Sequence, residues 1–357
     1  MRTASDSATH SPSFRPGMDQ PPGRVDNVPS AITGLPLRYF TPDPLTVLLD
    51  RCRPTAGAVP VVQDPRLEDA GLLLIASSSR RGPSGGVDFA QAMRFAEILT
   101  GLKQLDTLDE IVNAGRTLST RVTGLRDEIV FSGGPTASDA HLVYALPASL
   151  RQLLVSLEAG LAGLNESPLD PAIVVGVTGF FCIHLHPFVD ANGRWSRLVM
   201  ASVGARRKAG WPAMVQTSLQ NACKREFGER IWPEARANGL KNYLLLVHRF
   251  EQELTGRLHG SEILHALSTI TGEINRQART RSARQTTIAE LFSKNSVSVH
   301  KLREKFGSSA KSMAGFLDRV TSYSTIVRVE KDMLSIQGLI DASEAEFGAC
   351  VEKIVRG

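Results

Sequence analysis

Between about residues 88 and 257, apolar residues recur every three or four positions, which is the spacing of one face of a buried helix. This spacing predicts helices over seven segments: about 88–104, 106–120, 147–164, 170–185, 194–209, 219–228 and 238–257. From Ile173 to Leu185 the chain is apolar almost throughout, as is typical of a helix with no solvent-facing side. A mostly helical body is therefore expected.

The segment 125–146 has a different pattern. Two apolar runs, at 129–131 and 142–144, flank the turn-forming sequence from Ser132 to Pro135. Apolar runs on either side of a Gly-Pro cluster are typical of a β-hairpin. The expected fold is therefore mostly α with one hairpin.

A second, smaller module is expected after about residue 258. A connecting helix is predicted over 264–274 and a basic, polar link over 276–284. Three short apolar clusters at helical spacing come next, and two apolar runs around a Lys-Asp turn follow them at 326–329 and 333–336. Three short helices followed by a two-stranded hairpin resemble a winged helix-turn-helix module.

The N-terminal segment contains few large apolar residues and many Pro and Ser residues, so residues 1 to about 30 are expected to be disordered. Prolines from Pro36 to Pro65 predict irregular structure at the start of the body. These patterns divide the chain into five parts: a disordered tail (1–34), a helical domain with an N-terminal extension (35–257), a connecting helix and basic link (258–284), the winged-helix module (285–340) and a C-terminal helix or tail (341–357).

The composition is 42% hydrophobic and 22% charged, which is ordinary for a soluble globular protein. No apolar run approaches the length of a transmembrane helix, and the N-terminus lacks the apolar core of a signal peptide. We therefore expect a cytoplasmic protein with no membrane contact. The four cysteines are scattered and form no CxxC pair, so free thiols are expected rather than a zinc site or disulfides.

The net charge of +5 is unevenly distributed along the chain. Between residues 275 and 331, twelve Lys or Arg face four Asp or Glu, which gives this segment a net charge of +8. Such a balance favours contact with nucleic acid. Winged helices also dock on proteins or form dimers, and a charge excess can be a solvated face. DNA contact, protein contact and a homodimer therefore all stay open.

The twelve residues from His186 to Arg197 read His-Pro-Phe-Val-Asp-Ala-Asn-Gly-Arg-Trp-Ser-Arg and directly follow the apolar helix. Pro187 breaks the helical pattern, and the Asn-Gly pair at 192–193 supplies turn and capping chemistry for a new amphipathic helix. Arg194 and Arg197 are three positions apart, so they share a face of its first turn. Free backbone N–H groups and the positive end of the helix dipole favour an anion there. The residues alone therefore indicate a phosphate-binding site.

This stretch resembles the signature of Fic domain proteins, which typically transfer AMP from ATP to a hydroxyl side chain of a target protein. Eight of the nine defining positions match in spacing, and the ninth is Ala191, where glycine is usual. The resemblance extends weakly over about 35–255, since Phe180 to His184 and Tyr144 to Pro147 also look similar to the family. It implies a Fic-type helical core with a β-hairpin flap, and many bacterial members end in a winged helix.

The chemistry of AMP transfer suggests a role for the first polar residues of the motif. His186 would take the proton from the incoming hydroxyl, because the pKa of imidazole lies near the working pH. The resemblance implies that Asp190 holds Mg²⁺ on the α- and β-phosphates, which suits the preference of this ion for carboxylate and phosphate oxygens. His186 is therefore the predicted catalytic residue and Asp190 the predicted metal ligand.

The remaining motif residues are predicted to bind the nucleotide. Asn192 would hydrogen-bond the α-phosphate, and Gly193 would let the backbone approach closely and offer its N–H. Arg194 and Arg197 would clamp the β- and γ-phosphates. Phe188 is also predicted to be one of the nucleotide-binding residues.

Ala191 keeps two alternatives open. Related Doc-type toxins, which act as kinases, also carry Asp-Ala-Asn but have Lys where this chain has Gly193. Gly193 therefore favours AMP transfer, with Doc-like phosphotransfer as the alternative. A third reading is a catalytically weak, nucleotide-responsive DNA-binding regulator, with Ala191 as a sign of lost activity.

A regulatory candidate lies upstream of the motif. Many Fic proteins carry an inhibitory helix of pattern Ser/Thr-x-x-x-Glu-Gly/Asn, whose Glu pairs with the second Arg of the motif. Here Ser77, Arg81 and Gly82 occupy the pattern, and Arg81 would repel Arg197 rather than pair with it. The hypothesis is constitutive competence for ATP, and the alternative is a simple surface loop that Pro83 interrupts. An Arg81→Glu variant with lower activity or ATP affinity would support the hypothesis, and an unchanged one would refute it.

The expected partner is a protein with a Ser, Thr or Tyr hydroxyl, this chain included. Extended targets commonly dock on a hairpin edge through main-chain hydrogen bonds. The hairpin over 125–146 is therefore predicted to act as the flap that holds the target beside His186. Main-chain hydrogen bonds depend little on the side chains of the target, so the identity of the target stays open.

Overall fold

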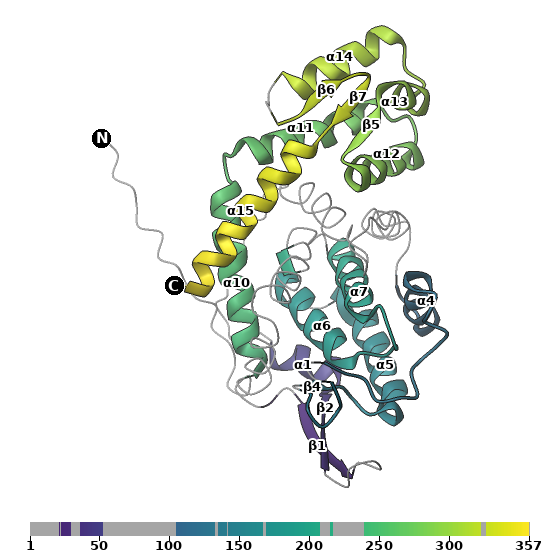
Figure 1. Cartoon of the computed structure of the whole chain (residues 1–357), viewed down its shortest axis with the longest axis vertical. Helices are drawn as coiled ribbons and strands as arrows, with labels where there is room; N and C mark the ends of the chain where they lie inside the picture. Colours follow the sequence, from purple (N-terminus) through teal and green to yellow (C-terminus); the bar gives the residue numbers. More distant parts are fainter. Residues whose placement is uncertain are drawn as a thin grey trace, which may run out of the picture.

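The fold is described from a computed structural model (Figure 1). The structure describes these residues: 21, 23–29, 36–52, 105–132, 135–140, 142–166, 169–207, 215–216, 239–322 and 326–356. The predicted helices over 88–104 and 219–228, and the regulatory candidates Ser77, Arg81 and Gly82, lie outside the described residues. Within these ranges, no helix is both long and apolar enough to cross a membrane.

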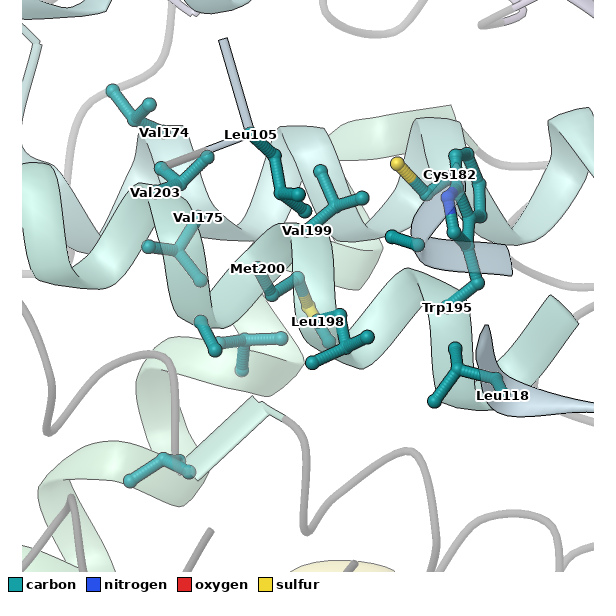
Figure 2. Packing of buried hydrophobic residues seen from close by; sticks show 14 of the residues in the cluster. Leu105, Leu118, Val174, Val175, Cys182, Trp195, Leu198, Val199, Met200 and Val203 are labelled. Atoms are coloured by element: carbon teal, nitrogen blue, oxygen red, sulfur yellow. The ribbon is translucent and has the colours of Figure 1, made fainter. Parts of the chain in front are cut away.

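Helices form the body, as the spacing of apolar residues predicts. Its helical elements are α1 (Leu45–Arg51), α4 (Leu108–Leu118), α5 (Pro147–Ala162), the short 3₁₀ helix η1 (Gly163–Glu166), α6 (Pro171–Leu185), α7 (Asn192–Arg206) and α10 (Gly239–Leu258). Helix α6 lies at the centre, and from Val174 to Leu185 every residue except Ile183 is buried. Figure 2 shows α6 and α7 packed through side chains such as Val175, Cys182 and Val199. The predicted buried helix is therefore confirmed.

The helices of the body begin at residues whose chemistry suits a helix start. Proline occupies the first turn of both α5 and α6, where its missing N–H costs no helical hydrogen bond. The Asp170 carboxylate caps α6 by accepting from the N–H of Ala172 at 2.8 Å. Helix α4 starts with a capping box between Thr107 and Glu110. Residues next to each helix start therefore specify where these helices begin.

A four-stranded sheet lies beside the helices, in the order β1-β2-β4-β3. Its strands are β1 (Gly23–Pro29), β2 (Pro36–Pro42), β3 (Phe131–Ser132) and β4 (Leu142–Val143). The antiparallel pair β3 and β4 is the predicted hairpin. Strand β2 adds to it in parallel, with Tyr39 opposite Val143. The predicted hairpin is therefore part of a larger sheet.

The first two strands correct the expectation for the N-terminal segment. Residues 23–29 were expected in a disordered tail and the start of the body was expected to be irregular, yet both segments pair as an antiparallel hairpin. The partner of β2 comes from about a hundred residues further along the chain, and the Phe40 ring packs on His184 at a centroid distance of 5.0 Å. Tertiary contacts therefore favour β2 as a strand and β1 pairs with β2, so local composition predicted neither strand.

The C-terminal module follows the order predicted from its apolar clusters. Its elements are α11 (Glu262–Gln277), α12 (Arg281–Lys294), β5 (Ser296–Ser298), α13 (Val299–Phe306), α14 (Ala310–Thr321), β6 (Arg328–Glu330), β7 (Met333–Ser335) and α15 (Gln337–Arg356). Lys331 and Asp332 both have positive φ, which suits the tight turn between β6 and β7. Helix α12 begins at Arg281, so the predicted link over 276–284 is wrong in its second half. Strand β5 was not predicted, and the winged-helix assignment stays a prediction.

Ion pairs inside this module use part of its positive charge. The buried Glu273 of α11 binds Arg276 at 2.6 Å and Arg319 of α14 at 2.9 Å. Four of the twelve basic residues of this segment are occupied in this way, because Glu290 of α12 likewise pairs with two lysines. The pairs with Arg319 and Lys305 join different helices, and because Glu290 is already counted in the net charge of +8, only Glu273 lowers that excess.

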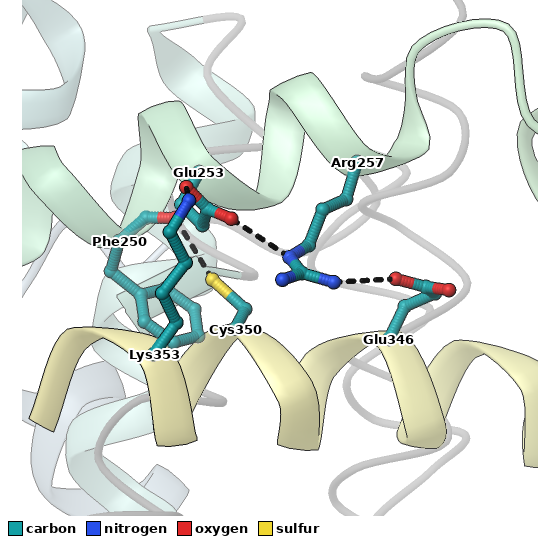
Figure 3. A network of polar contacts seen from close by, with 6 residues as sticks. All are labelled: Phe250, Glu253, Arg257, Glu346, Cys350 and Lys353. Atoms are coloured by element: carbon teal, nitrogen blue, oxygen red, sulfur yellow. Dashed lines mark hydrogen bonds and ion pairs between the residues drawn. The ribbon is translucent and has the colours of Figure 1, made fainter. Parts of the chain in front are cut away.

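Helix α15 folds back along α10, as Figure 3 shows. The Glu253 carboxylate binds Lys353 at 2.7 Å, and Arg257 bridges to Glu346 at 3.3 Å. The buried Cys350 thiol donates to the Phe250 carbonyl at 3.7 Å, and burial raises the pKa of this thiol to about 12. The ion pairs are partly exposed and therefore add little to stability. Buried side chains such as Phe250 and Cys350 contribute more to the packing of α15 on α10. Body and module are therefore connected by two chain segments (Figure 1).

Candidate active site

The motif forms a short loop between α6 and α7 that begins and ends at a left-handed residue. His186 has φ 48° and ψ 60° and closes the C-terminus of α6. Ala191 has φ 64° and ψ 7° and is the N-cap of α7. Two left-handed residues turn the chain sharply, so the loop brings the end of one buried helix next to the start of another.

Ala191 carries a measurable conformational cost. A left-handed alanine costs about 1–2 kcal/mol relative to glycine in the folded state, and glycine loses about 0.4–1 kcal/mol through its freer unfolded chain. We therefore expect Ala191→Gly to raise the free energy of unfolding by about 0.5–1 kcal/mol. Urea denaturation measures this change. Ala205→Gly, in the right-handed last turn of α7, is the matched control and should lower stability; a loss in both variants would contradict the argument.

The Asn192 side chain closes the loop. Its amide oxygen accepts from the N–H of Phe188 at 2.9 Å, and its amide nitrogen donates to the Phe188 carbonyl at 2.7 Å. The Phe188 ring is fully buried and meets Trp195 edge to face at a centroid distance of 5.5 Å. A Cβ on Gly115 of α4 would overlap this ring. Phe188 thus anchors the loop in the core, and Asn192 has one further amide hydrogen with which to meet a phosphate.

The His186 imidazole is held in one orientation. Its Nδ1 lies 3.2 Å from the carbonyl oxygen of Ile183, and its ring stacks on Tyr144 at a centroid distance of 3.6 Å and an angle of 11°. A carbonyl oxygen can only accept a hydrogen bond, so this contact places the ring hydrogen on Nδ1. In that neutral form of the ring, the lone pair lies on Nε2. The predicted catalytic residue is therefore oriented as a base.

Asp190 lies on the same loop and carries a negative charge. Its Oδ2 accepts from the Ser119 hydroxyl at 2.8 Å, and its Oδ1 accepts from the N–H of Ala191 at 2.6 Å. Burial is the largest single effect and raises the pKa of the Asp190 carboxyl, whereas these hydrogen bonds lower it. The nearby Arg194 and Arg121 guanidinium groups also lower this pKa, so the net shift is downward. A charged carboxylate at this position has the chemistry of a Mg²⁺ ligand.

Two guanidinium groups lie at the first turn of α7. Arg194 donates to the Leu118 carbonyl at 2.6 Å, and it lies 3.7 Å from the Asp190 carboxylate. Burial lowers the pKa of Arg197 to about 10, and the neighbouring Arg194 cation adds to this shift. Arg197 remains protonated at neutral pH. The exposed Gly193 directly precedes Arg194 in the same first turn, so an anion at this helix start would meet positive charge and backbone N–H groups.

Three further residues belong to this site, and the motif did not single them out as site residues. Ser119 orients Asp190, Tyr144 stacks on His186, and the guanidinium of Arg126 donates to the His186 carbonyl at 2.7 Å. Tyr144 directly follows β4, so the hairpin lies next to the predicted base. Each of the three is a single residue outside the motif; the resemblance included Tyr144 in the stretch from Tyr144 to Pro147 but gave it no role in the site.

Comparison with known proteins agrees with this geometry. Residues 104–203 match the model of the Fic/DOC family. A segment of 76 residues is 36% identical to "Protein adenylyltransferase Fic" of Drosophila melanogaster, and the same holds for the protein of that name from Drosophila sechellia. The match covers 21% of this chain and only 15% of each relative. Residues 104–203, which contain α4, α5, α6, the catalytic-motif loop and most of α7, are therefore a Fic/DOC family domain.

Proposed function

We propose that this protein is an adenylyltransferase that transfers AMP from ATP to a hydroxyl side chain of a protein. The observation that carries the proposal is the arrangement of one loop: a histidine oriented by its Nδ1 contact and by stacking on Tyr144 begins it, and a cationic helix start follows it. The Fic/DOC match and the names of the relatives support the same reaction class. AMP transfer needs a proton acceptor for the hydroxyl and positive charge around the phosphates, and the two ends of this loop would supply them.

In the proposed reaction, the hydroxyl oxygen of the target attacks the α-phosphorus of ATP. A new oxygen–phosphorus bond forms, and the bond between the α-phosphorus and the oxygen bridging to the β-phosphate breaks. The hydroxyl proton moves to Nε2 of His186, and pyrophosphate leaves with the electron pair of the broken bond. Stacking on Tyr144 keeps the imidazole oriented during this transfer.

The α7 end of the loop would hold the triphosphate. Gly193 offers its N–H at the helix start, and Arg194 and Arg197 place positive charge where negative charge accumulates on the leaving pyrophosphate. Asp190 would hold Mg²⁺, whose charge neutralises phosphate oxygens when it is bound. The second amide hydrogen of Asn192 would donate to the α-phosphate.

The hairpin would hold the target. In the described part of the chain no strand pairs with the outer edge of β3, while β2 covers the other side of β4. An extended target segment could add to the β3 edge through main-chain hydrogen bonds, which would bring its hydroxyl toward His186. The target would be a protein with an accessible Ser, Thr or Tyr, this chain included.

Parallel incubations with α-labelled and γ-labelled ATP and Mg²⁺ test the proposal. Label on protein from the α-phosphate alone supports AMP transfer. Label from the γ-phosphate alone would instead show Doc-like phosphotransfer, for which the alanine at 191 is the motivating observation. Label from neither, together with binding of DNA by the C-terminal module, would overturn transfer in favour of a nucleotide-responsive regulator.

A further inference from the structure

Arg126 lies in the segment between α4 and β3, and its side chain is buried beneath the catalytic loop. The residue is 3% exposed. Its Nε donates to the His186 carbonyl at 2.7 Å, and its two terminal nitrogens donate to the carbonyls of Glu128 at 2.9 Å and Ala145 at 2.5 Å. Its backbone N–H donates to the Pro187 carbonyl at 3.0 Å. One residue therefore bonds four carbonyls on three separate segments.

All three segments belong to parts of the protein that the proposed reaction uses. His186 carries the predicted base, Glu128 lies just before β3, and Ala145 lies just after β4. Arg126 thus connects the base to both legs of the hairpin that would hold the target. The residue before Ala145 is Tyr144, whose ring stacks on the His186 imidazole. The Arg126 guanidinium therefore fixes the carbonyl of His186, and the Tyr144 ring fixes its side chain.

The backbone of His186 explains why such a connection is needed. A left-handed histidine is strained, and it persists only where its surroundings hold it. The hydrogen bond from Arg126 to the His186 carbonyl and the one from its backbone to Pro187 both oppose relaxation of this turn. The planar guanidinium presents its donors in a fixed fork, which a lysine ammonium on a flexible stem cannot reproduce.

We infer that Arg126 is a positioning residue that fixes the His186 base and the target-holding hairpin in one geometry. The inference rests on the proposed AMP transfer. Arg126 acts through the backbone of the loop, so its loss should slow the chemical step and leave nucleotide binding intact. The first turn of α7 is held by other contacts, such as the bond from Arg194 to the Leu118 carbonyl.

The test compares Arg126→Lys with a matched control, Arg207→Lys, in the full chain. Arg207 also donates to two backbone carbonyls, those of Leu164 at 2.6 Å and Leu169 at 2.8 Å. It follows the last turn of α7, about 20 Å from the catalytic loop by the rise of a 15-residue helix. Both substitutions keep the charge and remove an arginine fork that holds the backbone. Only Arg126→Lys disturbs the loop.

Because a misplacement of about 1 Å can cost about a hundredfold in rate, Arg126→Lys should lower kcat for AMP transfer by about 10²-fold. Its Kd for ATP should stay within about twofold of the wild type, whereas Arg207→Lys should keep both values. Assays are run where the circular dichroism of each variant matches the wild type. If Arg126→Lys does not fold at any temperature, Arg126→Gln takes its place. Wild-type kcat in the folded Arg126 variant would overturn the inference.

A measurement without turnover separates this inference from the proposed function. Nitrogen-15 NMR of the His186 ring should show hydrogen on Nδ1 in the wild type and in Arg207→Lys, and a mixture of tautomers in the Arg126 variant. If wild-type protein transfers no AMP, the proposed function fails while this spectrum still tests Arg126. An unchanged His186 spectrum in the Arg126 variant would refute the positioning role.

Discussion

Replacing His186 with alanine is expected to lower AMP transfer by about 10²–10⁴-fold, which is the range that a general base contributes. Nε2 of His186 carries the lone pair that would accept the hydroxyl proton, and alanine has no proton acceptor. ATP should still bind, because the phosphate-binding groups belong to α7. Transfer of α-label measures the rate, and equilibrium binding of labelled ATP measures the affinity.

The matched control for this variant is His259→Ala. His259 is an exposed histidine between α10 and α11, so its loss should leave transfer and ATP binding at wild-type values. Substantial transfer by His186→Ala would remove His186 from the proposed mechanism. Loss of ATP binding in the same variant would assign the residue to nucleotide binding instead.

Replacing Trp195 with alanine is expected to lower the free energy of unfolding by about 3–5 kcal/mol, the usual cost of deleting a large buried aromatic side chain. Trp195 is fully buried in α7, packs edge to face on Phe188, and donates its indole N–H to the Ile111 carbonyl of α4 at 2.8 Å. The substitution leaves a cavity behind the loop. Urea unfolding followed by circular dichroism measures the change.

Trp195→Phe separates the two contributions of this side chain. Phenylalanine keeps most of the ring and loses the N–H, which leaves the Ile111 carbonyl without this donor at a cost of about 1–3 kcal/mol. The phenylalanine variant should therefore be more stable than the alanine variant. Equal destabilisation by the two substitutions would show that packing on Phe188 contributes little.

The sequence predicts the helices of the body well because their signals are local. The apolar run of α6 and the prolines at the starts of α5 and α6 lie within the elements that they specify. Strands β2 and β5 each pair with a strand that is distant in the chain, β1 pairs with β2, and the composition of all three is ordinary or rich in proline. Long-range pairing has no local signature, so these strands were missed.

The same distinction applies to the site. The motif identifies the loop and predicts an anion site at the start of α7, and the structure places its residues together there. It did not indicate that Asn192 closes the loop on Phe188, or that Ser119 orients Asp190. The sequence cannot predict these contacts. The first depends on how the loop backbone turns, and the second joins residues 71 positions apart.

The return of α15 along α10 affects how fragments of this protein can be interpreted. A fragment truncated after Leu258 would lose α15 and uncover the face of α10 around Phe250. An exposed apolar face promotes association and local unfolding, and α10 packs directly on α6, which carries the catalytic loop at its end. Lost activity in such a fragment would therefore reflect the uncovered helix as well as the missing C-terminal module.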